Sequence, residues 1–187
     1  MNNPTRILRT LDRHLDHPVS LVLFGRAAIC LGYTGSSADA AATQDVDAIL
    51  QLAQLESIEQ DGQFWDALAQ TNQDLETEGL YITHLFQEDQ VFLRREWAGD
   101  IVPIGLDGLI HLSLFRPATI DLILTKMMRG RDPEDMKDVR FLLGVEPINR
   151  IRMQNAFSSM RPIETPELQE AFLLALPTVL EMCPEQA

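Results

Sequence analysis

Short apolar runs separated by turn residues run through the first two thirds of the chain and predict a set of strands. Residues 19–24 form a continuous apolar run with branched side chains, which is typical of a buried strand. Residues 109–115 alternate between apolar and polar, and Asp107-Gly108 before them favours a hairpin, because Asp-Gly tolerates positive φ. The predicted strands are residues 19–24, 45–50, 81–86, 91–93, 101–104 and 109–115.

Apolar residues at helical spacing predict helices before, between and after these strands. An amphipathic segment follows Pro4 and ends near His17, and Gly79 is a typical end for a mostly helical segment over 56–80. Asp132-Pro133 is a typical helix start, with a capping carboxylate and a proline in the first turn. Strands mixed with helices, followed by a run of helices, predict an α+β or mixed α/β fold with a helical C-terminal part. Further helices are expected at residues 27–31, 117–128, 148–160 and 166–182.

The composition limits the classes of protein to which the chain can belong. Its 187 residues fit one domain of ordinary size with room for a helical extension. A formal net charge of −13 and a pI of about 4.6 argue against general nucleic-acid binding through the overall field. Basic residues crowd the segment 116–152, and acidic residues crowd the segment 56–78. We interpret this segregation as solvated helix faces, with a local basic patch as the alternative.

Cysteine usage and the N-terminal pattern predict where the protein resides. Cys30 and Cys183 lie far apart among apolar neighbours, which indicates reduced, buried thiols rather than a disulfide. The N-terminus leads into an amphipathic helix, and no run approaches the roughly 20 apolar residues of a membrane span. We therefore expect a cytoplasmic protein that does not bind membranes.

The segment Asp45-Val46-Asp47 is a candidate metal site. In an extended strand residues i and i+2 point to the same face, so Asp45 and Asp47 project together. Two carboxylates on one face repel each other, and a divalent cation relieves that repulsion. Hard oxygen ligands at this spacing suit Mg²⁺ or Mn²⁺. The alternative is a pair of solvated acidic residues at the end of a strand.

Several segments together resemble a known superfamily. An apolar strand, a glycine turn that opens a helix, and a strand bearing Asp-x-Asp resemble the core of the polymerase-β-like nucleotidyltransferases. More closely, the chain resembles DUF6036, a bacterial family of uncharacterised nucleotidyltransferase-like proteins, over roughly residues 20–143. The segments that carry the resemblance are Leu23-Phe24-Gly25-Arg26-Ala27-Ala28, Thr43-Gln44-Asp45-Val46-Asp47, residues 81–86, residues 121–131 and Asp135-Met136-Lys137-Asp138.

The resemblance implies both a fold and an activity. It implies a nucleotidyltransferase-like mixed sheet flanked by helices. We expect this domain to cover residues 1–146 and residues 147–187 to form a helical extension packed on it. It places Gly25 near the phosphates of a nucleotide, and Asp45 and Asp47 as holders of Mg²⁺ or Mn²⁺. The start of the helix after Gly25 favours anions, and Arg26 adds a fork of donors. In active members the metal orients an acceptor hydroxyl for attack on the α-phosphate.

The chain departs from the superfamily pattern at two places. Arg26 follows Gly25 where Gly-Gly or Gly-Ser is usual. The later strand offers Thr83 and His84 where active members have a third carboxylate, which leaves a general base unassigned. His84 is either an ordinary strand histidine or, beside the two aspartates, a third metal ligand or a base.

Two cations further along the chain are candidates for phosphate binding. Lys126 and Arg129 lie on the same side of one predicted helix, so both can face a phosphate, and Lys126 can assist catalysis. The alternative is a structural ion pair from Lys126 to Asp135 or Asp138 on the next helix.

Two functions are compatible with these residues. The first is a metal-dependent nucleotidyltransferase that moves a nucleoside monophosphate from an NTP to an unknown acceptor, such as an RNA end, a protein side chain or a small molecule. A toxin of a toxin–antitoxin pair is a sub-case. The second is a catalytically inactive module of the same fold that binds a partner protein, which the missing third acid favours. An ion pair from Arg26 to Asp45 or Asp47 would count against the first.

Overall fold

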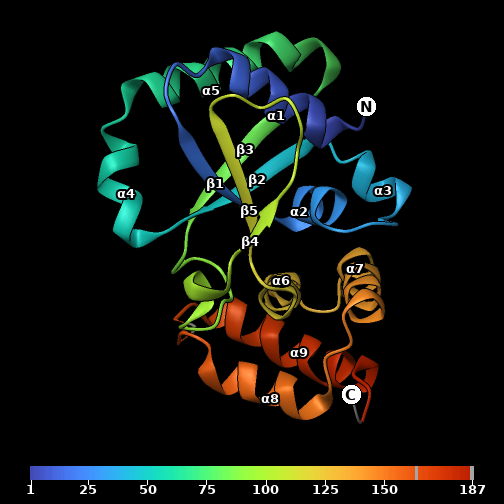
Figure 1. The fold of residues 1–187 in the computed structure, drawn as a ribbon. Coiled ribbons are helices and arrows are strands. Elements are labelled where there is room, and N and C mark those ends of the chain that lie inside the picture. The colour runs from blue at the N-terminus through green and yellow to red at the C-terminus, as the bar shows by residue number, and fades with distance from the viewer. Residues whose placement is uncertain (163, 186–187) are drawn as a thin grey trace. The chain divides into compact units, whose positions relative to one another are not determined.

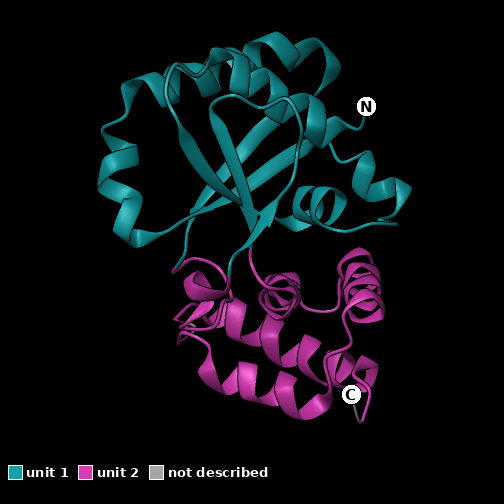
Figure 2. Cartoon of the chain, viewed as in Figure 1, with its two compact units in different colours: residues 1–88, 101–116 teal, residues 89–100, 117–187 magenta. Residues whose placement is uncertain are grey.

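The computed structural model describes residues 1–162 and 164–185, and these residues divide into two compact units. Unit 1 comprises residues 1–88 and 101–116, and unit 2 comprises residues 89–100 and 117–187 (Figure 2). No helix within the described ranges is long and apolar enough to cross a membrane. Cys30 and Cys183 are free thiols.

Unit 1 is built on a five-stranded mixed sheet (Figure 1). The strand order is β3-β2-β1-β5-β4, with β2 antiparallel to β1 and parallel to β3. Strand β5 runs parallel to β1 and antiparallel to β4, which confirms the predicted pairing around Asp107-Gly108, where Gly108 has a φ of +83°. The strands are β1 (Val19–Phe24), β2 (Asp45–Leu50), β3 (Tyr81–Gln87), β4 (Val102–Ile104) and β5 (Leu112–Arg116).

Helices flank this sheet and supply much of the core of unit 1. The first helix is amphipathic and buries Ile7, Leu8 and Leu11, as its spacing predicts. It packs against α5, as Figure 1 shows. The helices are α1 (Asn3–His14), α2 (Gly25–Gly32), α3 (Ala38–Ala41), α4 (Leu52–Glu59) and α5 (Gly62–Leu75).

The segment predicted as one helix over 56–80 contains a break. Its first residues belong to α4, and α5 begins anew because the side chain of Asp61 accepts a hydrogen bond from the Phe64 N–H at 3.0 Å and caps it. A short 3₁₀ turn follows α5, and Gly79, with a φ of +65°, ends it as predicted. The short helix α3 was not predicted.

Unit 2 contains four α-helices in its described part: α6 (Thr119–Lys126), α7 (Pro133–Val145), α8 (Arg150–Ser159) and α9 (Pro166–Met182). The predicted cap of α7 is confirmed, because the side chain of Asp132 accepts from the N–H groups of Glu134 and Asp135. The predicted strand at 91–93 is wrong. These three apolar residues are buried outside any strand, because a short apolar run can fill a core without joining a sheet.

The division into units differs from the one predicted at residue 146, since α6 and α7 fall with the C-terminal helices. Ion pairs tie α6 to α7, from the Lys126 ammonium to the carboxylates of Asp135 and Asp138. The turn after α6 lies against α9. A Cβ built on Gly130 in this turn would sit only 3.6 Å from the carbonyl oxygen of Ala171 in α9. Contacts between residues this far apart in sequence are not visible in local patterns.

Candidate functional site

The carboxylates of Asp45 and Asp47 stand near the start of β2, where its pairing with β3 is irregular. Val46 pairs with Ile82, and the next pair is Ala48 with Leu85. Two residues of β3, Thr83 and His84, therefore stand opposite the single residue Asp47. This is a β-bulge, a feature that is over-represented next to active sites because it re-aims side chains.

The bulge brings Thr83 and His84 to one carboxylate oxygen. The Thr83 hydroxyl donates a hydrogen bond to Asp47 Oδ1 at 2.7 Å, and Nδ1 of His84 lies 3.6 Å from the same oxygen. The Asp47 side chain is 24% exposed and the His84 side chain 65% exposed, so the group faces solvent. The prediction that His84 lies beside an aspartate of the pair is confirmed at Asp47.

Two partners of this group escaped the sequence reasoning. The hydroxyl of Thr43 donates to Asp45 Oδ1 at 2.7 Å, a contact that the spacing of two residues alone could have suggested. The ring of Phe86 stacks on that of His84, with centroids 5.2 Å apart. These contacts hold the carboxylate and the imidazole in defined orientations.

The electrostatics of the pair disfavour two ionised carboxylates. Burial is the main reason that the pKa of Asp47 is raised above its usual value. The hydrogen bond from Thr83 opposes this rise, and the negative charge of Asp45 adds to it. A cation bound here would remove the repulsion and favour the ionised form of Asp47.

The turn from β1 into α2 lies against Asp47. Phe24, the last residue of β1, pairs with Asp47, and Gly25 follows with a φ of +65°, which favours glycine. A Cβ built on Gly25 would lie 3.7 Å from Asp47 Oδ2. The N-cap residue of α2, Phe24, has no side-chain group that caps the helix, and N–H groups at the start of a helix favour an anion. A carboxylate pair and an anion-binding helix start thus lie side by side.

Among the described residues, histidine is the basic residue type that contacts the aspartate pair. Neither Asp45 nor Asp47 forms an ion pair with a lysine or arginine within the described chain, and the one pair recorded for them is Asp47 with His84. Arg26, the second residue of α2, is partly exposed. Arg26 has interactions of its own, and none of the ion pairs of the described residues joins it to Asp45 or Asp47.

A complete set of protein ligands for a metal ion is not assembled. Among residues 1–162 and 164–185, no three groups from His, Cys, Asp and Glu side chains are placed to hold one metal ion. The predicted ligands Asp45, Asp47 and His84 thus share one region, with His84 in contact with Asp47. This geometry suits an ion that takes its remaining ligands from substrate and water, as Mg²⁺ usually does.

Lys126 and Arg129 lie in unit 2, where Lys126 forms the structural ion pairs considered as the alternative and Arg129 forms an ion pair that was not predicted. The Lys126 ammonium is 3.0 Å from Asp135 Oδ1 and 2.7 Å from Asp138 Oδ2, and its side chain is 9% exposed. Nε of Arg129 lies 2.7 Å from Asp135 Oδ2. Acidic partners within unit 2 therefore balance both cations.

No model of a known protein family matches the chain, and no curated protein or solved structure is detectably similar to it. The functional interpretation therefore rests on the resemblance described in the sequence analysis and on the geometry of the molecule itself.

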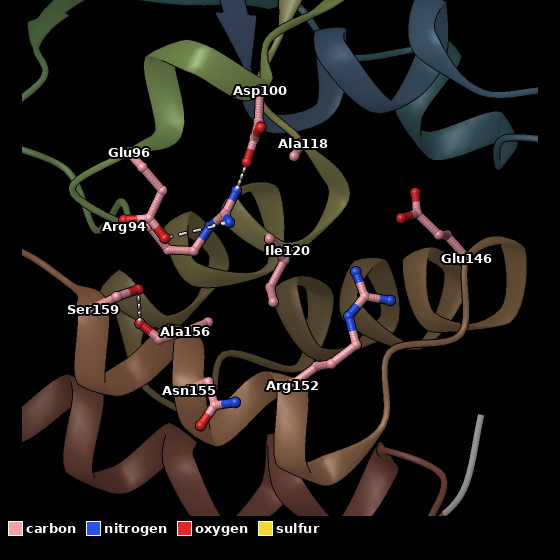
Figure 3. A pocket seen from close by; sticks show the side chains of 10 residues that line it. All are labelled: Arg94, Glu96, Asp100, Ala118, Ile120, Glu146, Arg152, Asn155, Ala156 and Ser159. Atoms are coloured by element: carbon pink, nitrogen blue, oxygen red, sulfur yellow. Dashed lines mark hydrogen bonds and ion pairs between the residues drawn. The ribbon is translucent and has the colours of Figure 1, made fainter.

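A pocket of about 350 Å³ in unit 2 was not predicted (Figure 3). On one side the guanidinium of Arg94 binds Asp121 at 2.7 Å and Asp100 at 2.9 Å. Figure 3 shows Arg152 on the other side of Ile120. The hydroxyl of Ser159 donates to the carbonyl of Ala156 at 3.1 Å rather than to a base. The pocket combines opposite charges with an apolar floor, and its lining contains none of the predicted site residues.

Proposed function

We propose that the protein is a metal-dependent nucleotidyltransferase that moves a nucleoside monophosphate from an NTP to an acceptor hydroxyl. The observation that carries this proposal is a pair of strand carboxylates, free of ion pairs to lysine or arginine in the described chain, beside the start of α2. A site for a phosphate and its cation needs two kinds of group. The cation needs a carboxylate that is not already paired with a lysine or arginine, and the phosphate needs backbone N–H donors.

The residues present suit a magnesium or manganese ion. Asp45 and Asp47 would hold it, since Mg²⁺ is commonly bound by one or two carboxylates together with substrate phosphates and water. When bound, the ion neutralises phosphate charge and orients the α-phosphate for in-line attack.

Gly25 and Arg26 have the chemistry to hold the phosphates. Gly25 lacks a side chain at the point where the backbone turns past Asp47, so a phosphate can approach the N–H groups of α2. Arg26 supplies donors one residue later. The imidazole of His84 lies beside the same site, with its Nδ1 3.6 Å from the carboxylate of Asp47.

We assign His84 as the base, because its side chain is largely exposed and an imidazole nitrogen can accept the proton of a hydroxyl. In the transfer, the acceptor oxygen bonds to the α-phosphorus and the bond to the bridging oxygen breaks. Pyrophosphate leaves, and the hydroxyl proton passes to the imidazole. The presence of Thr83 and His84 where a third carboxylate would stand also favours the second candidate, an inactive module that binds a partner protein.

Thermal unfolding with each NTP, with and without Mg²⁺ or Mn²⁺, tests the proposal. A ligand at a hundred times its dissociation constant stabilises the fold by about 2.7 kcal/mol. We expect this gain only with metal and NTP together, and its loss in Asp45→Asn/Asp47→Asn.

The matched control is Glu167→Gln/Glu170→Gln, which neutralises two exposed carboxylates of α9. This variant should still be stabilised by metal and NTP together. If no NTP shifts the wild-type protein while all variants fold, the transferase is rejected in favour of the binding module. If NTP binds but His84→Gln transfers as fast as the wild type, the assignment of the base is wrong.

A further inference from the structure

Helix α4 is an eight-residue helix that buries none of its residues. Helices this short are marginal in water and usually depend on packing. Here the two ends are held instead. The Leu52 N–H donates to a carboxylate oxygen of Glu88 at 3.3 Å, and Nε1 of Trp65 donates to the Ile58 carbonyl at 2.8 Å. Figure 1 shows α4 at the outer edge of unit 1, and its body is uncovered.

Apolar side chains line one side of this uncovered helix. Leu52, Leu55 and Ile58 recur every third residue and so lie along one side, and Trp65 is bonded to the end of that row. Leu52 is 43% exposed and Trp65 is 38% exposed, while the other two are partly exposed. We call these four residues the α4 face.

The rim of the α4 face is acidic and uncompensated. The chain has no lysine or arginine between Arg26 and Arg94, a stretch with twelve aspartates and glutamates. The rim residues are exposed and form no ion pair with any residue in the described ranges: Glu56, Glu59 and Asp66.

At the far end of α5, two acids contact residues of α1. Asp74 pairs with His14, and Glu78, just after α5, pairs with Arg6. By contrast, the three rim acids beside the exposed apolar residues of α4 have no ion pair with any described residue.

We propose that the α4 face docks a basic amphipathic helix of a partner protein. An amphipathic helix binds by packing its apolar side against an exposed apolar row, such as that of the α4 face. Basic residues on the partner helix, opposite the acidic rim, would then guide its approach and fix its register. The acidic rim repels nucleic acid and anionic membranes. The proposal needs neither metal nor nucleotide at Asp45 and Asp47, so the two proposals can fail separately.

The test uses a labelled, helix-forming peptide of leucine and lysine as the probe, with fluorescence anisotropy as the readout. We expect the peptide to bind the 187-residue chain with an affinity that falls as salt is raised, because the contact is partly electrostatic. The matched peptide with glutamate in place of lysine should not bind. Circular dichroism on each variant checks that the fold is intact.

Variants locate the contact on the surface. Glu56→Lys/Glu59→Lys should weaken binding of the lysine peptide by about tenfold or more, because it reverses the rim charge. Leu52→Ser should weaken it several-fold without unfolding, since Leu52 is exposed. The matched control Glu170→Lys/Glu181→Lys changes two exposed acids of α9 and should leave affinity within about twofold.

Three results would overturn the proposal. Equal weakening by the control pair would mean that the peptide responds only to net charge. Unchanged affinity in Leu52→Ser would remove the apolar part of the contact. Sedimentation of the free protein as a dimer that Leu52→Ser dissociates would assign the α4 face to a second copy of the chain.

Discussion

Asp12 is a buried carboxylate that ties α1 to the start of β5, and its removal tests how unit 1 is held together. It is 4% exposed. Its Oδ1 accepts from the backbone N–H groups of His111 and Leu112, each at 2.8 Å. The N–H of Ile110 lies 3.1 Å from Oδ1 and 2.9 Å from Oδ2. One side chain therefore satisfies three successive backbone donors.

The structure predicts different losses in the free energy of unfolding for Asp12→Ala and Asp12→Asn. Ile110 is 82% exposed, so after Asp12→Ala water can reach its N–H, whereas the donors of His111 and Leu112 are less accessible. At roughly 1–3 kcal/mol for each unsatisfied donor, we expect a loss of about 2–4 kcal/mol. In Asp12→Asn the amide oxygen still accepts from these two donors, so we expect a loss of about 1 kcal/mol.

The contribution of Asp12 also depends on pH. Burial alone would raise the pKa of Asp12, but the hydrogen bonds from the three N–H groups outweigh burial and lower it. The stabilisation is therefore fully present above the unfolded-state pKa of about 3.9, and it is lost as pH falls through the lower folded-state pKa. The difference between wild type and Asp12→Asn should shrink over that acidic range.

Urea unfolding followed by circular dichroism, at neutral pH and in steps down to pH 3, measures these differences. Asp66→Ala removes an exposed acid of α5 and serves as the control, with an expected change within about 0.5 kcal/mol. The reasoning is refuted if Asp12→Ala costs no more than Asp66→Ala, or no more than Asp12→Asn.

Three further predictions concern stability. Lys126→Met leaves two buried carboxylates without the lysine that both contact, so it should lower the free energy of unfolding in urea by about 3–5 kcal/mol. If the variant is as stable as the wild type, the structural role of Lys126 is refuted and Lys126 is again a candidate for catalysis. Gly32→Ala places a Cβ 2.5 Å from Cδ of Arg116 and should destabilise by roughly 1–3 kcal/mol. In α7, a Cβ added at Gly144 meets nothing within 4 Å, so Gly144→Ala should stabilise the protein by roughly 0.5–1 kcal/mol. Melting temperatures that shift in the same direction for the Gly32 and Gly144 variants would contradict this account.

The elements that could be predicted from the sequence are those specified by residues close together in the chain. The strand over 19–24 has its predicted bounds, because a continuous branched run bounded by a proline and a glycine has few alternatives. The cap at Asp132 and the turn at Gly108 depend on the chemistry of single residues, so they too were predicted.

Features that depend on distant contacts were predicted less well. The segment over 56–80 has helical periodicity throughout, but the capping bond from Phe64 to Asp61 starts a new helix within it. The boundary between the units follows contacts such as those of Lys126 with α7, between residues that only the fold brings together. Periodicity carries no information about either choice.

The candidate site shows the same limit at a single residue. In a regular strand Thr83 and His84 point to opposite faces, so the pattern alone can place one of them beside Asp47. The register shift after Val46 adds a residue on β3, and both side chains then approach the same carboxylate oxygen. A hydroxyl and an imidazole thus both lie beside Asp47. If the site is catalytic, it uses a nitrogen base held by Asp47 rather than a carboxylate, and loss of transfer in His84→Gln with metal and NTP binding retained would separate that chemistry from simple binding.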